Sequence, residues 1–204
     1  MLFLIGGAAR AGKTILARRI CAGRGAAHIS IDTVIARLAT TMPELGLEIR
    51  DPARKRAEIV WPVLRAIAEN SSRASTEFLL EGDALLPSQA ASVIQARPGA
   101  VKACFIGYAH ANPETKLREI RRYAAGRDDW THELGDAALL KLIGELRTFS
   151  GYLRSECDRH GVAYFDASDR FAIALQDAES YLQLPGSSAR QPAPQPAQSS
   201  LRFP

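Results

Sequence analysis

Aromatic residues, cysteines and long blocks of one charge are scarce in this sequence. Aromatic residues make up 7% of the 204 residues, and no basic stripe is interleaved with them, which is untypical of a nucleic-acid-binding surface. The three cysteines, Cys21, Cys104 and Cys157, are widely spaced and form no CxxC motif, so we expect reduced thiols in the core. Neither a nucleic-acid partner nor a disulfide framework is expected.

Long apolar runs are also absent. The N-terminal MLFLIGG is shorter than the apolar region of a signal peptide, and no segment reaches the length of a membrane span. We therefore expect a cytoplasmic protein that does not bind a membrane. The formal net charge of +4 favours anionic small molecules as partners.

Five short apolar runs alternate with segments of helical period. This alternation predicts an α/β fold of βαβ units, in which helices cover both faces of a mostly parallel sheet. A binding site in such a sheet lies at the carboxyl ends of the strands. The predicted strands are Leu2–Ile5, Ala27–Ile31, Glu77–Leu80, Val101–Ile106 and Val162–Phe165.

The chain also divides into regions of different character. The two longest connections, residues 32–74 and 108–161, are where substrate-binding and lid elements are expected. Residues 185–204 contain five of the eleven prolines and have no apolar periodicity, so we expect a disordered tail there. The predicted domain is residues 1–184.

A glycine-rich loop follows the first predicted strand and precedes a helical run. Its sequence, GAARAGKT, satisfies GxxxxGK[ST], in which backbone N–H groups surround phosphate oxygens at a helix N-terminus. Lys13 would neutralise phosphate charge and the Thr14 hydroxyl would bind Mg²⁺, which predicts a nucleoside triphosphate site. The alternative is a glycine-rich turn that binds nothing. The expected nucleotide-binding residues are Gly7, Ala8, Ala9, Arg10, Ala11, Gly12, Lys13, Thr14 and Ile15.

From residue 1 to about 184 the chain resembles the small P-loop kinases of the adenylate-kinase-like group, which includes nucleoside monophosphate, shikimate and gluconate kinases, chloramphenicol phosphotransferase and zeta toxins. The motifs that carry the resemblance are GGAARAGKT, HISID, FLLEGD, LREIRR and YFDASD. The resemblance implies a three-layer fold with a five-stranded parallel sheet in the order 2-3-1-4-5. It also implies ATP and Mg²⁺, a substrate-binding insertion at about 33–74 and a helical lid at about 112–135.

Asp32 ends the second predicted strand, and the resemblance implies that it contacts the hydroxyl group that receives the phosphoryl group. A carboxylate near the γ-phosphate can orient such a hydroxyl and accept its proton. The alternative interpretation is an N-cap of the helix over residues 33–39, because aspartate is a favoured cap.

Glu81 and Asp83 follow the third predicted strand and are the candidate acids for Mg²⁺. Magnesium keeps several waters and is often held through carboxylates. Glu81 resembles the strand-three acid of the family and EGDALLP resembles a stretch of some of its kinases, and the assignment between the two acids stays open. A Glu-Gly-Asp turn without a metal is the alternative.

The helix after the fourth predicted strand carries a cluster of basic residues. Arg118 and Arg122 lie on one helical face with Arg121, and the resemblance implies that such lid arginines close on the triphosphate. A solvated face is the alternative. Arg37, Arg50 and Arg54 lie in the substrate-binding insertion and could bind an anionic acceptor. The alternative is again that they are solvated surface residues.

Three functions are compatible with these features. The first is transfer of the ATP γ-phosphoryl group to a hydroxyl of a small-molecule acceptor, with Lys13, Asp32, Arg118 and Arg122 as catalytic residues. The second is a nucleoside monophosphate kinase, although residues 40–58 lack the expected base-binding and phosphate-binding motifs. The third is a nucleotide-binding regulatory protein with little phosphoryl transfer. We expect a monomer or a homodimer.

Overall fold

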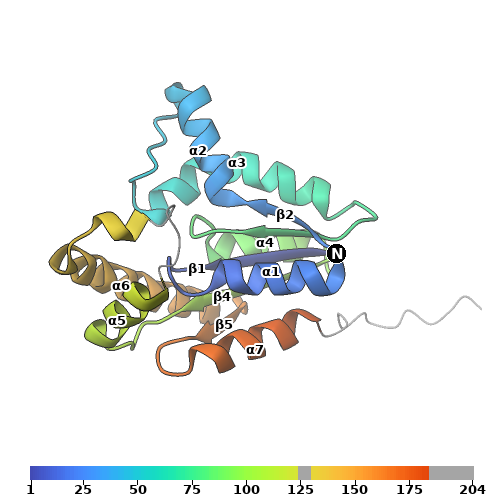
Figure 1. Cartoon of the computed structure of the whole chain (residues 1–204). Helices are drawn as coiled ribbons and strands as arrows, with labels where there is room; N and C mark the ends of the chain where they lie inside the picture. Colours follow the sequence, from blue (N-terminus) through green and yellow to red (C-terminus); the bar gives the residue numbers. More distant parts are fainter. Residues whose placement is uncertain (124–129, 184–204) are drawn as a thin grey trace, which may run out of the picture.

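Five parallel strands form one central sheet in the order β2-β3-β1-β4-β5 (Figure 1). The structure is a computed structural model that describes residues 1–123 and 130–183. The predicted α/β class and strand order are both confirmed. The strands are β1 (Leu2–Gly7), β2 (Ala27–Ser30), β3 (Phe78–Glu81), β4 (Val101–Gly107) and β5 (Ala163–Asp166).

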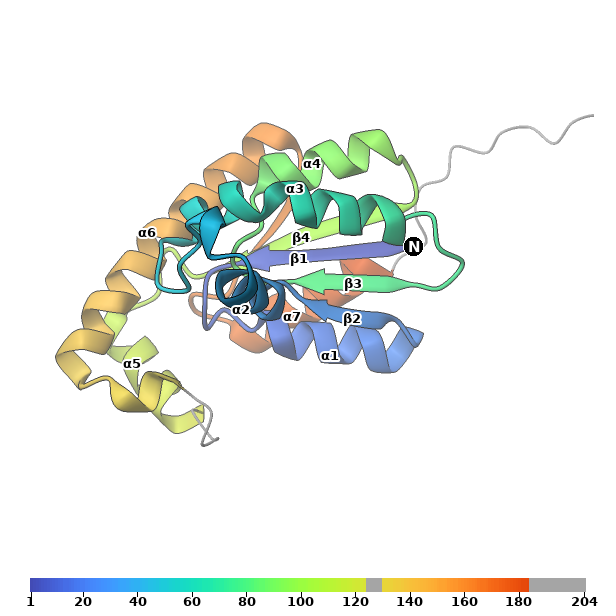
Figure 2. The same cartoon turned by 90° about the horizontal axis from the view of Figure 1, so that it is seen from above.

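Helices cover both faces of this sheet. Helices α1 and α7 pack on one face, and α3, α4 and the C-terminal half of α6 pack on the other (Figure 2). No helix in the described part of the chain combines the length and apolarity that a membrane crossing requires. The helices are α1 (Lys13–Arg24), α2 (Ile31–Thr41), α3 (Ala53–Ser71), α4 (Pro87–Ala96), α5 (Pro113–Tyr123), α6 (Asp136–His160) and α7 (Phe171–Gln183), with short 3₁₀ helices η1 (Pro43–Leu45) and η2 (Trp130–Glu133).

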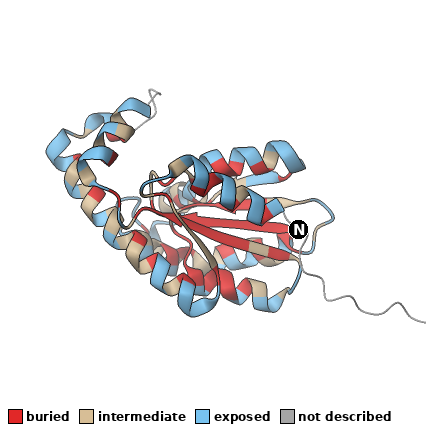
Figure 3. Cartoon of the chain, turned by 90° about the horizontal axis from the view of Figure 1, so that it is seen from below, coloured by how far each residue is buried: buried red, intermediate tan, exposed pale blue. Residues whose placement is uncertain are grey.

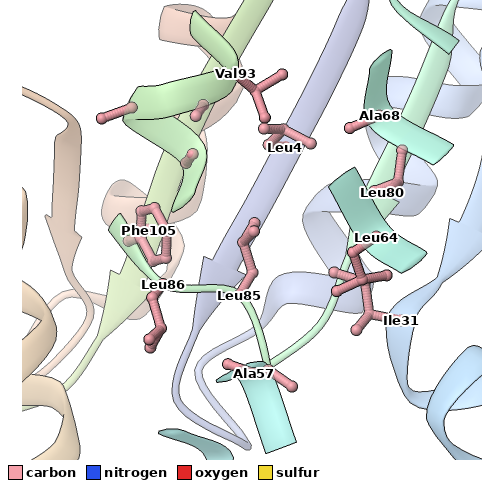
Figure 4. Packing of buried hydrophobic residues seen from close by; sticks show 14 of the residues in the cluster. Leu4, Ile31, Ala57, Leu64, Ala68, Leu80, Leu85, Leu86, Val93 and Phe105 are labelled. Carbon is pink, nitrogen blue, oxygen red and sulfur yellow. The ribbon is translucent and has the colours of Figure 1, made fainter. Parts of the chain in front are cut away.

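Strand β1 lies at the centre of the core because its side chains are buried on both faces (Figure 3). Leu2 and Leu4 join the cluster under α3 and α4, whereas Phe3 and Ile5 join the cluster under α1 and α7. Figure 4 shows the first cluster, where Phe105 lies beside the central strand. Burial on both faces explains why the strand is a continuous apolar run rather than an alternating one.

The edge strand β2 differs from the prediction. We expected a strand through Ile31 covered on both faces, but β2 ends at Ser30, and its residues are exposed or half-buried. The Ser30 hydroxyl accepts a hydrogen bond from the Thr33 N–H at 3.4 Å, so Ser30 is the N-cap of α2. Asp32 therefore lies in the first turn of α2, and the alternative interpretation of Asp32 as the cap is wrong.

Helix α5 and the start of α6 extend beyond the carboxyl ends of the strands (Figure 2). They pack through a separate small apolar cluster that includes Ile120, Leu139 and Ile143. This helical pair and η2 occupy the region in which we expected the lid. Residues 124–129 of the expected lid, and the expected tail, lie outside the described residues.

The closest approach of β1 to β4 provides a test of this fold. A Cβ added at Gly7 would lie 2.1 Å from the Ile106 carbonyl oxygen, and Gly7 has a φ of +141°. We expect Gly7→Ala to lower the free energy of unfolding by more than about 3 kcal/mol, as a backbone clash in the core does. The measurement is urea unfolding followed by circular dichroism.

The matched control is Gly144→Ala in the middle of α6. Nothing lies within 4 Å of a Cβ at Gly144, so this variant should gain about 0.5–1 kcal/mol from the higher helix propensity of alanine. A Gly7→Ala protein that unfolds at the wild-type urea concentration would contradict the assigned contact between β1 and β4.

Candidate active site

The loop between β1 and α1 has the backbone geometry of a phosphate-binding nest. Gly7 and Gly12 have φ values of 141° and 98°, and Arg10 between them has a φ of 63°. No side chain caps the N-terminus of α1, and its first turn holds no acidic residue. The N–H groups of that turn therefore stay available for an anion at the positive end of the helix dipole.

One side-chain hydrogen bond lies within this loop, and two others connect the loop to its surroundings. The buried Lys13 ammonium donates a hydrogen bond to the Ala8 carbonyl at 3.0 Å, and the Tyr108 hydroxyl donates to the Ala9 carbonyl at 2.8 Å. The Arg10 guanidinium donates to the Thr131 hydroxyl of η2 at 3.1 Å. The loop is thus held from β4 and from the lid region.

A cleft of about 1050 Å³ opens above this loop and runs between α2, α5 and α7. It brings together nine predicted residues from three separate segments of the sequence. These are Ala9, Arg10, Gly12, Lys13, Thr14, Ile15, Asp32, Glu81 and Asp83. The remaining lining residues are Arg18, Lys116, Glu119, Ile120, Tyr123, Phe171 and Ala172.

The geometry separates the two candidate Mg²⁺ acids. The Thr14 hydroxyl lies 3.4 Å from Glu81 Oε1, and His28 Nε2 lies 3.7 Å from the same oxygen. Asp83 instead accepts two hydrogen bonds from Arg56, so Glu81 is the acid beside the phosphate loop.

These oxygen donors suit Mg²⁺ in a nucleotide complex. Within residues 1–123 and 130–183, no group of three or more histidine, cysteine, aspartate or glutamate side chains could hold a metal alone. Mg²⁺ typically takes few protein ligands and completes its shell with water and substrate phosphates. Thr14 and Glu81 would supply the protein side of such a site.

Asp32 lines the same cleft as the phosphate loop, and its side chain is 56% exposed. Partial desolvation by the cleft walls and the nearby charge of Asp83 raise the pKa of Asp32 to about 6, against the opposing effect of Lys13 and Arg56. Asp32 is therefore a carboxylate whose affinity for a proton suits a general base near neutral pH.

Arg56 is a site residue that the sequence analysis missed. Its Nη2 donates to both Asp83 oxygens at 2.9 and 3.0 Å, its Nε donates to the Asp51 carbonyl at 2.9 Å, and its Nη1 lies 4.0 Å from Asp32. No motif marks Arg56, because it is one of several basic residues at the start of α3. Arg56 does not itself line the cleft; the packing of α3 near the end of β3 brings it to Asp83, which does.

The lid arginines do not reach the cleft in this structure. Arg118 donates a hydrogen bond to the Thr115 hydroxyl, and Arg122 lies beside the Tyr123 ring. Arg121 pairs with Asp136 and ties α5 to the start of α6. Neither Arg118 nor Arg122 is among the residues that line the cleft.

Lys116 is the basic residue of α5 that lines the cleft. It is 4% exposed, and its Nζ lies 4.5 Å from the centre of the Tyr108 ring and 3.5 Å from Glu119 Oε2. Burial lowers the pKa of Lys116 from its ordinary value. The substrate-region arginines Arg37, Arg50 and Arg54 do not line the cleft.

No protein-family model matches this sequence, and no curated protein is similar to it. Solved structures do match the fold. The chain has the fold of the small P-loop kinases. Shikimate kinase from Bacteroides thetaiotaomicron matches with a TM-score of 0.57 and 17% identity, over 90% of this chain and 99% of that chain.

Two further kinase structures match at the same identity of 17%. A gluconokinase from Sinorhizobium meliloti 1021 has a TM-score of 0.52, over 88% of this chain and 90% of that chain. A sugar kinase from Janibacter sp. HTCC2649 has a TM-score of 0.51, over 89% of this chain and 93% of that chain. The resemblance drawn from the motifs is thus confirmed in the fold.

The assignment of Glu81 to Mg²⁺ has a direct test. We expect Glu81→Gln to raise the Mg²⁺ concentration needed for half-maximal ATP binding by about tenfold, because an outer-shell carboxylate orients the waters of the ion. The measurement is calorimetric titration of ATP at a series of Mg²⁺ concentrations. Affinity for ATP without Mg²⁺ should not fall.

The matched control is Glu145→Gln, which removes the same charge from an exposed position on α6. It should leave the Mg²⁺ dependence unchanged. An equal Mg²⁺ requirement in wild type and Glu81→Gln would argue against Glu81 as the metal acid.

Proposed function

We propose that this protein is an ATP-dependent phosphotransferase that moves the γ-phosphoryl group to a hydroxyl of a small molecule. The observation that carries the proposal is that one cleft is lined both by the phosphate loop and by the Asp32 carboxylate. A triphosphate site alone serves many functions, whereas a carboxylate with a raised pKa in the same cleft suits an acceptor hydroxyl. The three similar structures are all of kinases, which supports this reaction class.

The phosphate side of the cleft has the charge that phosphoryl transfer needs. Lys13 would leave the Ala8 carbonyl for the β- and γ-phosphate oxygens, and Arg10, Arg18 and Lys116 line the same space. Mg²⁺, when bound beside Thr14 and Glu81, supplies further positive charge to the phosphate oxygens. The N–H groups at the start of α1 complete the binding of the phosphates.

Asp32 would orient the acceptor and take its proton. The acceptor oxygen forms a bond to the γ-phosphorus, the bond from that phosphorus to the bridging oxygen breaks, and ADP leaves. The hydroxyl proton passes to the Asp32 carboxylate. In this proposal Arg118 and Arg122 act on the phosphoryl group only after α5 has turned toward the cleft.

The test is acceptor-dependent ADP release from Mg-ATP across hydroxyl metabolites, antibiotics, nucleosides and nucleoside monophosphates. With the acceptor found, Lys13→Ala and Asp32→Asn should each lower kcat by about 100-fold or more, since they remove a phosphate-stabilising charge and a general base. Lys141→Ala, on the exposed side of α6, is the control and should keep full activity.

Other outcomes would overturn the proposal. Turnover with monophosphates alone, unaffected by Asp32→Asn, would indicate a nucleoside monophosphate kinase. Tight Mg-ATP binding without turnover of any acceptor would indicate a regulatory nucleotide-binding protein.

The raised pKa of Asp32 predicts the pH profile of the reaction. A base must be deprotonated, so kcat/KM for the acceptor should fall as the pH drops through about 6. Asp83→Asn should move this midpoint to lower pH, because the Asp83 charge raises the pKa of Asp32. A profile that is flat from pH 5 to 8 would argue against Asp32 as the base.

A further inference from the structure

We propose that the acceptor is a neutral or amine-bearing hydroxyl compound, and that Asp83 is the residue that excludes anionic acceptors. This inference rests on the proposed function and specifies its substrate class. It follows from the way in which Arg56, a basic residue 4.0 Å from Asp32 that lies outside the phosphate loop, is bound.

The hydrogen-bonding capacity of Arg56 is largely used within the protein. Nε donates to the Asp51 carbonyl and Nη2 donates to both oxygens of Asp83. The remaining nitrogen, Nη1, lies 4.0 Å from Asp32. Only Nη1 is left for an incoming carboxylate or phosphate, so such an anion could not bind this guanidinium through two nitrogens in the bidentate manner that anions prefer.

The charges on the acceptor side do not favour an anion either. Asp32 and Asp83 carry two negative charges against the one positive charge of Arg56. The basic residues that line the cleft, including Lys13 and Arg10, belong to the phosphate loop, α1 or α5. A second anion beside bound ATP would thus meet like charge, whereas an ammonium group or an uncharged hydroxyl would not.

The pair of Arg56 and Asp83 is too constrained to open easily. Their side chains are 11% and 16% exposed, and parting them would leave two poorly solvated charges. The backbone before Asp83 is also held, because a Cβ at Gly82 would lie 2.6 Å from the Ile31 Cβ of α2. Asp83 is therefore kept against Arg56.

Three probes that differ only at one end test the inference. They are gluconate, sorbitol and 1-amino-1-deoxysorbitol, which carry a carboxylate, a hydroxymethyl and an ammonium group on the same carbon chain. Their dissociation constants are measured by calorimetry on the protein saturated with Mg²⁺ and a non-hydrolysable ATP analogue. Transfer of phosphate from Mg-ATP to each probe is measured separately.

In wild type we expect gluconate to bind at least about tenfold more weakly than sorbitol or the amine. Asp83→Asn keeps the shape of the side chain and frees the Arg56 charge, so gluconate should gain about tenfold, the amine should lose affinity and sorbitol should change little. Glu69→Gln is the matched control. It also removes one negative charge, at a position about 20 Å from Arg56 along α3, and it should leave the order of the three affinities unchanged. Asp83→Ser serves if circular dichroism shows that Asp83→Asn is unfolded.

Wild-type protein that binds gluconate most tightly, or an Asp83→Asn protein that gains no affinity for gluconate, would overturn the inference. If no probe binds the wild type, a gain of gluconate binding in Asp83→Asn still supports it, and no gain overturns it. Probes that bind in the expected order while no acceptor is ever phosphorylated would instead disprove the proposed function and leave the charge selectivity standing.

Discussion

The contact between β1 and β4 at Gly7 is the constraint on which the rest of the site depends. The Ala8 N–H donates to the Ile106 carbonyl at 3.1 Å, so the chain leaves β1 pressed against the neighbouring strand. Tyr108, just beyond β4, then holds the Ala9 carbonyl. With both strands fixed in a buried core, the loop must turn sharply into α1, and its N–H groups converge where phosphate oxygens can bind.

The cleft brings both signs of charge together. Cations from the phosphate loop, α1 and α5 line it together with the carboxylates of Asp32, Glu81, Asp83 and Glu119. Such an arrangement suits a reaction that holds a polyanion beside a hydroxyl. Asp83 occupies Arg56, and in our proposal this pairing gives the acceptor its charge class.

The spacing of the arginines in α5 did not predict which basic residue of this helix lines the cleft. Spacing three and four residues apart puts Arg118, Arg121 and Arg122 near one another, but it does not say which way that side of the helix points. In the folded protein the apolar cluster around Ile120 sets the rotation of α5 on α6, and Arg121 forms an ion pair with Asp136. As a result Lys116, not Arg118 or Arg122, lines the cleft.

Local patterns in the sequence determined the strands of the sheet, the glycine-rich loop and the three candidate acids Asp32, Glu81 and Asp83. These features depend on neighbouring residues, because apolar runs, glycine spacing and a GKT motif act over a few positions. The strand order was predicted only from the resemblance to a known family. The tertiary structure alone decided the cap of α2, the separation of Glu81 from Asp83, the place of Lys116 and the role of Arg56. The cap of α2 is a contact between Ser30 and Thr33, and the sequence offered Asp32 as an equally suitable cap. The other three depend on which side chains from distant segments meet at one end of the sheet, and 27 positions separate Arg56 from Asp83. A contact of that kind has no local signal, since only the packing of α3 against the sheet creates it.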